Sequence, residues 1–147
     1  MPATYGKGEG AMLELKNVCK TFHPNTPNEK KALTNLNLTL EDGDFVTVIG
    51  SNGAGKSTML NAIAGTWPID SGAVVIDGED VTRLPEHKRA VYLGRVFQDP
   101  MNGTAADMEI EENLALALRR GQTRGLAWGI RSKERENYRE ILKMLLY

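Results

Sequence analysis

The sequence predicts an α/β fold, and three neighbouring stretches carry that prediction. Residues 45–49 form an apolar, mostly β-branched run, Phe-Val-Thr-Val-Ile, which is typical of a central parallel strand buried on both faces. Residues 50–58 continue as the glycine-rich stretch GSNGAGKST. Ser57 to Ala64 contain neither glycine nor proline and predict a helix that ends at Gly65. A buried strand, a glycine-rich turn and a helix in this order indicate an α/β architecture.

The composition is that of an ordinary soluble domain. The chain has 147 residues, of which 41% are hydrophobic and 25% charged, with a net charge of −1. A net charge this small gives no general attraction to nucleic acid or anionic lipid, so we expect no nucleic-acid partner. The sequence has a single cysteine, no apolar run of about 18 residues and no signal peptide. These features predict a cytoplasmic protein, with residues 1–10 as a flexible tail.

The chain before the glycine-rich stretch predicts antiparallel strands. Met12 to Thr21 alternates apolar and polar residues as a half-buried strand does. Residues 23–31 hold two prolines and two asparagines and predict a loop. Leucines at 36, 38 and 40 alternate with polar residues and predict a second half-buried strand, and residues 41–44 form a turn into the apolar run.

The chain after the predicted helix begins with a hairpin. Residues 73–76 and 79–81 flank an Asp77-Gly78 turn, and 85–90 predict one or two helical turns. Near residue 104 the sequence changes from strand-rich to helix-rich. In the helical part, apolar residues recur at helical spacing from Ile110 to Leu118 and predict one helix. A last helix is predicted after Ser132, its N-cap, with an apolar stripe at Tyr138, Ile141, Leu142 and Leu145.

The stretch 50–58 fits the phosphate-binding pattern G-x-x-x-x-G-K-[ST]. Its glycines permit a tight curl, so the backbone N–H groups and the positive end of the following helix favour an anion such as a diphosphate. Lys56 adds a cation against the outer phosphates, and the Ser57 hydroxyl can ligate Mg²⁺. We therefore predict a nucleotide site formed by Gly50, Ser51, Asn52, Gly53, Ala54, Gly55, Lys56, Ser57 and Thr58.

Together with this loop, two further features give the sequence a family resemblance. Phe22 lies at the end of the first predicted strand, and Val96-Phe97-Gln98-Asp99-Pro100 follows the hairpin. With these features, residues 12–147 resemble the ATP-binding subunit of ABC transporters. The resemblance implies ATP and Mg²⁺ as cofactors. It implies that Phe22, where the family usually has tyrosine, stacks on adenine. It also implies that Gln98 contacts Mg²⁺ and the attacking water and senses the membrane partner.

The resemblance also implies an organisation. It is that of a P-loop NTPase in which residues 11–103 form an antiparallel β subdomain with the phosphate-loop core and 104–147 begin a helical subdomain. The implied partners are transmembrane permease subunits, a second ATP-binding subunit in a homodimer and, indirectly, a solute-binding protein. The implied location is peripheral, at the inner face of the cell membrane. The loop 23–31 and the insertion 121–132 are similar to those of bacterial small-solute importers.

The sequence departs from the family pattern after Gln98. No L-S-G-G-Q motif, no apolar strand ending in Asp-Glu and no later histidine follow it, because His23 and His87 both precede it. Asp77 imitates the end of such a strand but belongs to a turn. We therefore expect the N-terminal part of an ATP-binding domain, which binds MgATP weakly and turns it over negligibly, since hydrolysis needs a group that orients water.

Three other functions stay open at this point. The chain can belong to a soluble ABC-type ATPase that acts on ribosomes or DNA, although such proteins usually carry basic arms. It can be another P-loop kinase or GTPase. A kinase would need an arginine-rich lid, for which Arg119, Arg120, Arg124 and Arg131 are available, although a solvated face is the simpler interpretation of these residues. A GTPase would need an Asn-Lys-x-Asp motif to recognise guanine, and the sequence has none. Finally, it can be a nucleotide-binding module without a transporter.

Overall fold

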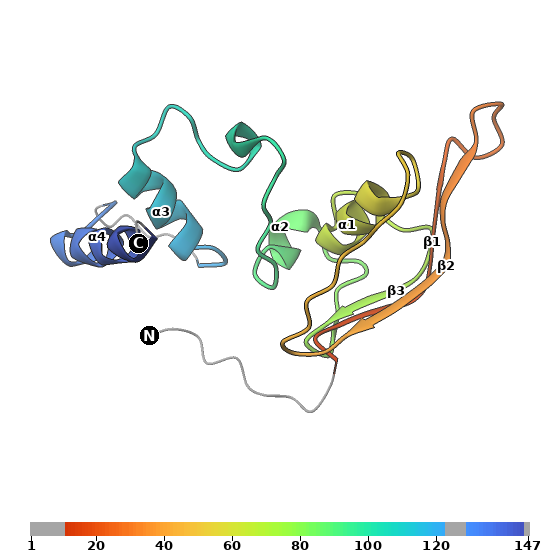
Figure 1. Cartoon of the computed structure of the whole chain (residues 1–147), viewed down its shortest axis with the longest axis horizontal. Helices are drawn as coiled ribbons and strands as arrows, with labels where there is room; N and C mark the ends of the chain where they lie inside the picture. The colour runs from red at the N-terminus through yellow and green to blue at the C-terminus, as the bar shows by residue number, and fades with distance from the viewer. Residues whose placement is uncertain (1–10, 123–128, 146–147) are drawn as a thin grey trace. The chain divides into compact units, whose positions relative to one another are not determined.

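The computed structural model describes residues 11–122 and 129–145, so the predicted tail 1–10 and Arg124 lie outside the described residues. It divides into two compact units, with the boundary between Tyr92 and Leu93 (Figure 1). The first unit carries the strands and the glycine-rich loop. The second unit carries two longer helices.

The first unit contains a four-stranded antiparallel sheet in the order β2-β1-β3-β4. Figure 1 labels β1, β2 and β3. The strands are β1 (Leu13–Phe22), β2 (Lys30–Leu40), β3 (Ser71–Ile76) and β4 (Glu79–Asp80). The predicted strand at 12–21 and the predicted hairpin at 73–81 are thereby confirmed. β2 starts well before the predicted alternation, because its first residues, which do not alternate, are held by the backbone ladder with β1, up to the pairing of Phe22 with Lys30.

Two helices complete the first unit. These are α1 (Lys56–Ala64), which ends at Gly65 as predicted, and α2 (Glu86–Arg89). Asp77 and Gly78 both have positive φ, 50° and 78°, as a two-residue hairpin turn with right-handed strand twist requires. The core is formed by apolar side chains of the sheet, of one face of α1 and of Val81, which follows β4. The sheet and α1 contribute Leu13, Leu15, Val18, Leu33, Met59, Ala62, Ile63, Val74 and Ile76.

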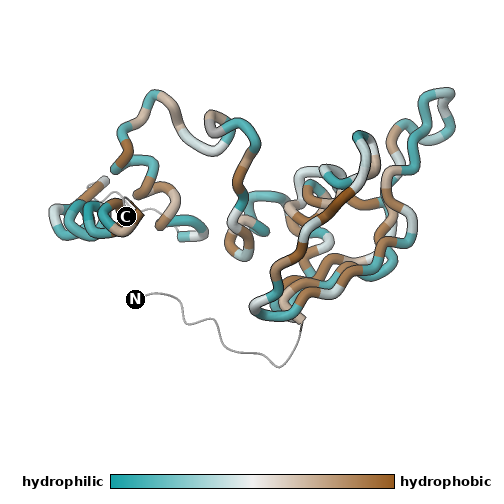
Figure 2. The backbone as a smooth tube through the Cα atoms, viewed as in Figure 1, coloured by the Kyte–Doolittle hydropathy of each residue, from teal (hydrophilic) through white to brown (hydrophobic). Residues whose placement is uncertain are grey.

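The prediction of a buried central strand at residues 45–49 is wrong for this structure. These residues form no strand, and Phe45 and Ile49 are 95% and 90% exposed. The stretch leading into α1 is strongly apolar (Figure 2). A parallel strand needs neighbouring strands to pair with its backbone, and no described residue forms a strand beside it. The amino-acid pattern indicates that this segment can form a buried strand, but it does not indicate whether partner strands are present.

The second unit contains the 3₁₀ turn η1 (Pro100–Asn102) and the helices α3 (Ile110–Leu118) and α4 (Ser132–Leu145). Both predicted helices are confirmed. Ser132 is the first helical residue rather than the N-cap, because the Arg131 N–H already donates to the Glu134 carboxylate at 2.7 Å. Ala115 and Tyr138 are buried, whereas Leu145, at the end of the predicted stripe, is 75% exposed.

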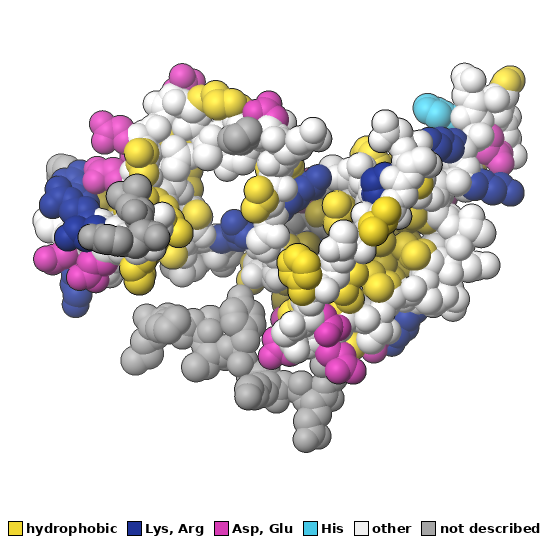
Figure 3. Space-filling view, viewed as in Figure 1, with side chains coloured by type: hydrophobic (Ala, Val, Ile, Leu, Met, Phe, Trp, Pro, Cys, Tyr) yellow, Lys and Arg dark blue, Asp and Glu magenta, His cyan; other side chains and the backbone are white. Residues whose placement is uncertain are grey.

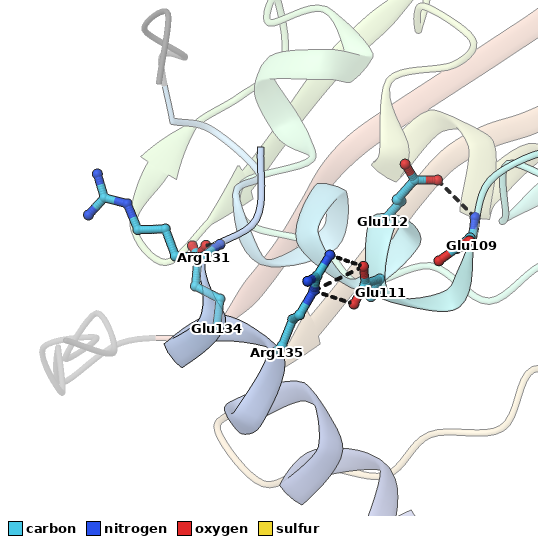
Figure 4. Close-up of polar contacts among 6 residues, drawn as sticks. All are labelled: Glu109, Glu111, Glu112, Arg131, Glu134 and Arg135. Carbon is cyan, nitrogen blue, oxygen red and sulfur yellow. Dashed lines mark hydrogen bonds and ion pairs between the residues drawn. The ribbon is translucent and has the colours of Figure 1, made fainter. Parts of the chain in front are cut away.

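Two ion pairs join α3 to α4. Arg135 binds Glu111 with both Nε and Nη2 (Figure 4). At the C-cap of α3, Arg119 Nη2 lies 2.7 Å from Glu134 Oε1. Arg119 is therefore an ion-pair partner within its own unit rather than part of a basic lid. At the start of α3, the carboxylates of Glu109 and Glu112 form a capping box.

Candidate phosphate-binding site

The glycine-rich stretch forms a curled loop rather than an extended segment. Gly53 and Gly55 have φ of 86° and 88°, the left-handed region that glycine enters without steric cost. The Ala54 N–H donates to Ser51 O at 3.2 Å, which closes a turn. The loop leads directly into α1, whose N-cap is Gly55 and has no side-chain cap. The loop and the helix end therefore combine two features that favour anions.

The first turn of α1 leaves backbone donors available. The first hydrogen bond of the helix runs from Met59 N–H to Gly55 O at 2.8 Å. The N–H groups of Lys56, Ser57 and Thr58 therefore have no acceptor within the helix, as at every helix start. The Ser57 side chain is exposed at this end, while Thr58 is only 8% exposed and packs inward.

The Lys56 ammonium is held against the loop itself. Its Nζ donates to Gly50 O at 2.5 Å and to Ser51 O at 2.7 Å. Both bonds fold the side chain back over the start of the loop, which places a positive charge beside the first residues of the loop. A methyl group added at Gly50 would lie 3.0 Å from the Ala54 side chain, so the curl also depends on the small residue there.

The first residues of β2 run alongside the loop. A Cβ at Gly55 would lie 2.5 Å from the Ala32 carbonyl oxygen, and a Cβ at Gly53 would lie 3.3 Å from Lys30 Nζ. Only glycine at position 55 allows the Ala32 carbonyl to come this close. The phosphate-binding loop is therefore packed directly against β2. In the sequence, Lys30 falls within the predicted loop 23–31 and belongs to no functional pattern. Its proximity to Gly53 depends on a contact between segments far apart in the chain.

Phe22 lies at the end of β1, opposite Lys30 in the register. Its ring is half-buried and meets the Trp67 ring edge-on, with centroids 5.1 Å apart and planes at 82°. The Lys20 ammonium lies 5.5 Å from the Phe22 ring centroid. Trp67 was not singled out in the sequence, since a single aromatic in a loop carries no pattern.

Asp70 fixes this end of β1. Its carboxylate accepts the Thr21 N–H at 2.5 Å and the Lys20 ammonium at 3.1 Å. Although partial burial acts in the opposite direction, these hydrogen bonds and the Lys20 charge lower the pKa of Asp70 below its ordinary value. Asp70 therefore stays ionised and holds Lys20 near Phe22.

Arg89 joins α1 to the segment that follows the hairpin. The residue is 2% exposed, and its guanidinium donates to Ala62 O at 2.8 Å, Ile63 O at 3.0 Å and Thr82 O at 2.7 Å. A cation against the last carbonyls of a helix is favourable. Burial lowers the pKa of Arg89, which Asp80 partly opposes. The sequence shows only a charged residue in a short helix, so this role could not be predicted.

Gln98 lies in the second unit, on an exposed stretch before η1. The next residue, Asp99, caps that turn, because its Oδ1 accepts the Met101 N–H at 3.0 Å and its carbonyl accepts the Asn102 N–H at 3.1 Å. Arg95 lies three residues before Gln98, and its guanidinium is 4.5 Å from the Phe97 ring centroid. The role of Gln98 at Mg²⁺ and water stays a prediction.

Comparison with known proteins gives consistent matches. The family model described as ABC transporter matches residues 33–145. The tyrosine transport ATP-binding protein of Clostridioides difficile is 46% identical over 123 residues, which are 83% of this chain and 49% of that protein. The spermidine/putrescine import ATP-binding protein PotA of Haemophilus influenzae is 38% identical over 108 residues, 74% of this chain and 27% of that protein.

Solved structures agree with the sequence matches. The dimeric ABC transporter cassette MJ0796 superposes with a TM-score of 0.70 at 34% identity, covering 90% of this chain and 56% of that one. A post-hydrolysis state of the same cassette, bound to ADP and Pi, gives the same values.

The curled loop, the lysine at its end and the helix that begins there define a P-loop protein of the α/β class, as the sequence predicted. Within that class, the chain belongs to the ABC transporter family. It spans about half the length of the curated relative from C. difficile and 27% of PotA. Within residues 11–122 and 129–145, no helix has the length and apolar character needed to cross a bilayer.

Proposed function

We propose that this chain binds MgATP as part of the ATP-binding subunit of an ABC importer. The observation that carries the proposal is the curled loop 50–55 with the Lys56 ammonium folded over it. Support also comes from the relatives, which include importer ATP-binding proteins, and from the related cassette bound to ADP and Pi.

The loop would hold the phosphates. Its N–H groups and those of the first turn of α1 provide donors, and Lys56 provides charge. The donor set also fits Mg²⁺, because Ser57 presents an exposed hydroxyl on the first turn of α1, and Mg²⁺ favours oxygen ligands from hydroxyls, waters and substrate phosphates. When bound, Mg²⁺ would neutralise phosphate charge. The role that the family resemblance implies for Gln98, contact with Mg²⁺ and the attacking water, is part of this proposal.

Phe22 would hold the adenine. Its half-buried ring lies at the β1–β2 strand end, and the first residues of β2 also approach the phosphate loop. An aromatic ring that is fixed by Trp67 and Asp70–Lys20 loses little conformational freedom when a base stacks on it. The adenine and phosphate sites are thereby connected through one strand pair.

For the whole protein we propose the partners that the family resemblance implies. They are permease subunits in the membrane and a second ATP-binding subunit, with a solute-binding protein acting through the permease. The subunit would lie at the cytoplasmic face of the membrane. Residues 11–103 would form the nucleotide-binding part and 104–147 the beginning of a helical subdomain. For the 147-residue chain alone we expect MgATP binding with negligible turnover.

The test is a titration of the chain with a fluorescent ATP analogue, with and without Mg²⁺. We expect saturable binding that Mg²⁺ strengthens and that unlabelled ATP displaces. Lys56→Ala should weaken binding at least tenfold, since a charge-assisted contact of about 1.5–3 kcal/mol is lost. Lys88→Ala removes an equal charge from an exposed position on α2 and should leave binding unchanged.

Two results would contradict the proposal. If ATP does not bind, or binds equally well to Lys56→Ala and wild type, the loop at residues 50–58 is not a nucleotide-binding site. ATP hydrolysis by the 147-residue chain that Lys56→Ala abolishes would overturn the expectation of negligible turnover.

A further inference from the structure

Lys30 is a second cation beside the phosphate loop. It opens β2, its side chain is exposed, and its ammonium lies 3.3 Å from the point where a Cβ of Gly53 would be. The approach is fixed by the backbone, because two residues further along β2 the Ala32 carbonyl lies against Gly55. The start of β2 therefore carries the Lys30 charge to the middle of the loop.

The Lys30 charge is not neutralised locally. Within the described ranges, Lys30 takes part in no ion pair. The neighbouring carboxylate of Glu29 is directed into its own loop, where it accepts the Asn25 N–H at 2.9 Å. An exposed ammonium beside a glycine-rich loop that leads into a helix N-terminus is complementary to a polyphosphate rather than to a neutral group.

Lys30 also lies between the two parts of the proposed nucleotide site. It pairs in register with Phe22, the proposed adenine platform, and its ammonium lies beside Gly53 of the phosphate loop. A nucleotide with its base on Phe22 and its phosphates in the loop would therefore lie close to this lysine.

We propose that Lys30 contacts the phosphates of the bound nucleotide and adds to the charge that Lys56 provides. This inference rests on the proposed nucleotide binding and deepens it, because it makes Lys30 a determinant of how many phosphates the site prefers. A lysine that binds phosphate acts as a point charge. Its contribution should therefore increase from AMP to ADP to ATP and decrease with salt.

Lys31 provides a matched control. It follows Lys30 in the same strand, is also exposed and pairs with Thr21. Successive side chains of a strand point to opposite faces. Lys31→Ala therefore makes the same change in net charge one residue away, on the face that does not approach Gly53.

The experiment measures the affinity of the chain for adenosine, AMP, ADP and ATP by competition against a fluorescent nucleotide. It is done for wild type, Lys30→Ala, Lys30→Arg, Lys31→Ala and Lys56→Ala, at low and high salt. Lys30→Ala should weaken ATP binding about two- to fivefold, as the loss of an exposed charge contact does, and leave adenosine unchanged. Lys30→Arg should restore most of the loss. Circular dichroism melts check that each variant folds.

The possible outcomes separate the two proposals. If Lys56→Ala weakens ATP binding while Lys30→Ala behaves as Lys31→Ala, the nucleotide site stands and the role of Lys30 is overturned. A loss in Lys30→Ala that is equal for adenosine and ATP also overturns it, because that result indicates a structural effect on Phe22. If wild type binds no ATP, both proposals fail.

Discussion

Gly43 and Gly55 share a backbone φ of +88°, yet their surroundings differ. Within 4 Å of a Cβ built at Gly43 there is nothing, whereas a Cβ at Gly55 would lie 2.5 Å from the Ala32 carbonyl oxygen. The two glycines therefore separate the cost of left-handed backbone from the cost of a steric clash. The glycine that fits the phosphate-binding pattern is the one for which both costs apply.

We expect Gly55→Ala to destabilise the chain more than Gly43→Ala. A left-handed alanine costs about 1–2 kcal/mol, and overpacking against backbone adds about 1–3 kcal/mol. Urea unfolding followed by circular dichroism measures both variants. Gly55→Ala should also weaken nucleotide binding, and Gly43→Ala should not. Equal unfolding midpoints for the two variants would contradict the close approach of β2 to the loop.

Phe22→Ala should weaken ATP binding without changing the binding of inorganic tripolyphosphate. Stacking of a base on an aromatic ring is worth about 1–3 kcal/mol, so the expected loss for ATP is about five- to a hundredfold. Competition titrations with both ligands measure it. Phe22→Tyr keeps the ring and serves as the control. A loss of tripolyphosphate affinity in Phe22→Ala would show instead that the strand end has rearranged.

At the scale of elements, Arg89 links α1 to the segment after the hairpin. Its guanidinium binds two carbonyls at the end of α1, together with Thr82 O and Leu84 O. Gly65 leaves the space for it, because a Cβ there would lie 2.8 Å from Arg89 Nε. The helix that begins at the phosphate loop is thus held at its other end by one side chain.

Arg89→Met should lower the free energy of unfolding by about 3–5 kcal/mol. Removal of the guanidinium leaves buried carbonyls without donors, and losses of this size follow when a buried hydrogen-bonded charge is removed. Thermal and urea unfolding measure the change. Arg83→Met, at an exposed position in the same segment, should change stability by less than about 0.5 kcal/mol. A similar, small loss of stability in both variants would contradict the role of Arg89 in linking α1 to the segment after the hairpin.

The pair of α3 and α4 should lose stability at acid pH. The Arg131 N–H and the Arg119 guanidinium lower the pKa of Glu134 from its ordinary 4.5. A carboxyl whose folded pKa is lowered stabilises the fold above its unfolded pKa, and this stabilisation disappears as pH falls through the folded pKa. Helical circular dichroism of the wild type should therefore decrease below about pH 4.5. Glu134→Gln should weaken the helix pair already at pH 7 and flatten that dependence.

Much of the fold follows from local patterns. Alternation, the Asp77-Gly78 turn and the Gly65 helix end depend on nearby residues, so β1, β3, α1 and α4 could be predicted from the sequence. The phosphate loop could be predicted for the same reason, since its pattern is contiguous. Lys30 and Arg89 could not, because their positions depend on contacts with residues 23 to 27 positions away.

At the scale of the whole molecule, the first unit leaves apolar surface uncovered. Phe45 and Ile49 are 95% and 90% exposed, and hydrophobic side chains lie open on its surface (Figure 3). Among the described residues, none forms a backbone hydrogen bond with 45–49. A segment with both exposed apolar side chains and unpaired backbone is a template for strand pairing with another chain.

We therefore expect the 147-residue chain to self-associate through residues 45–49. Sedimentation velocity across a range of concentrations should show species larger than the monomer, and the double substitution Phe45→Ser with Ile49→Ser should shift the distribution toward monomer. The control is Met144→Ser with Leu145→Ser, which removes side chains that are 73% and 75% exposed at the end of α4. There the backbone N–H groups already donate within the helix and the chain is not extended, so mainly apolar area is lost and the effect should be smaller. A monomeric wild type, or an equal shift from both double variants, would show that the open backbone of 45–49 recruits no partner strand.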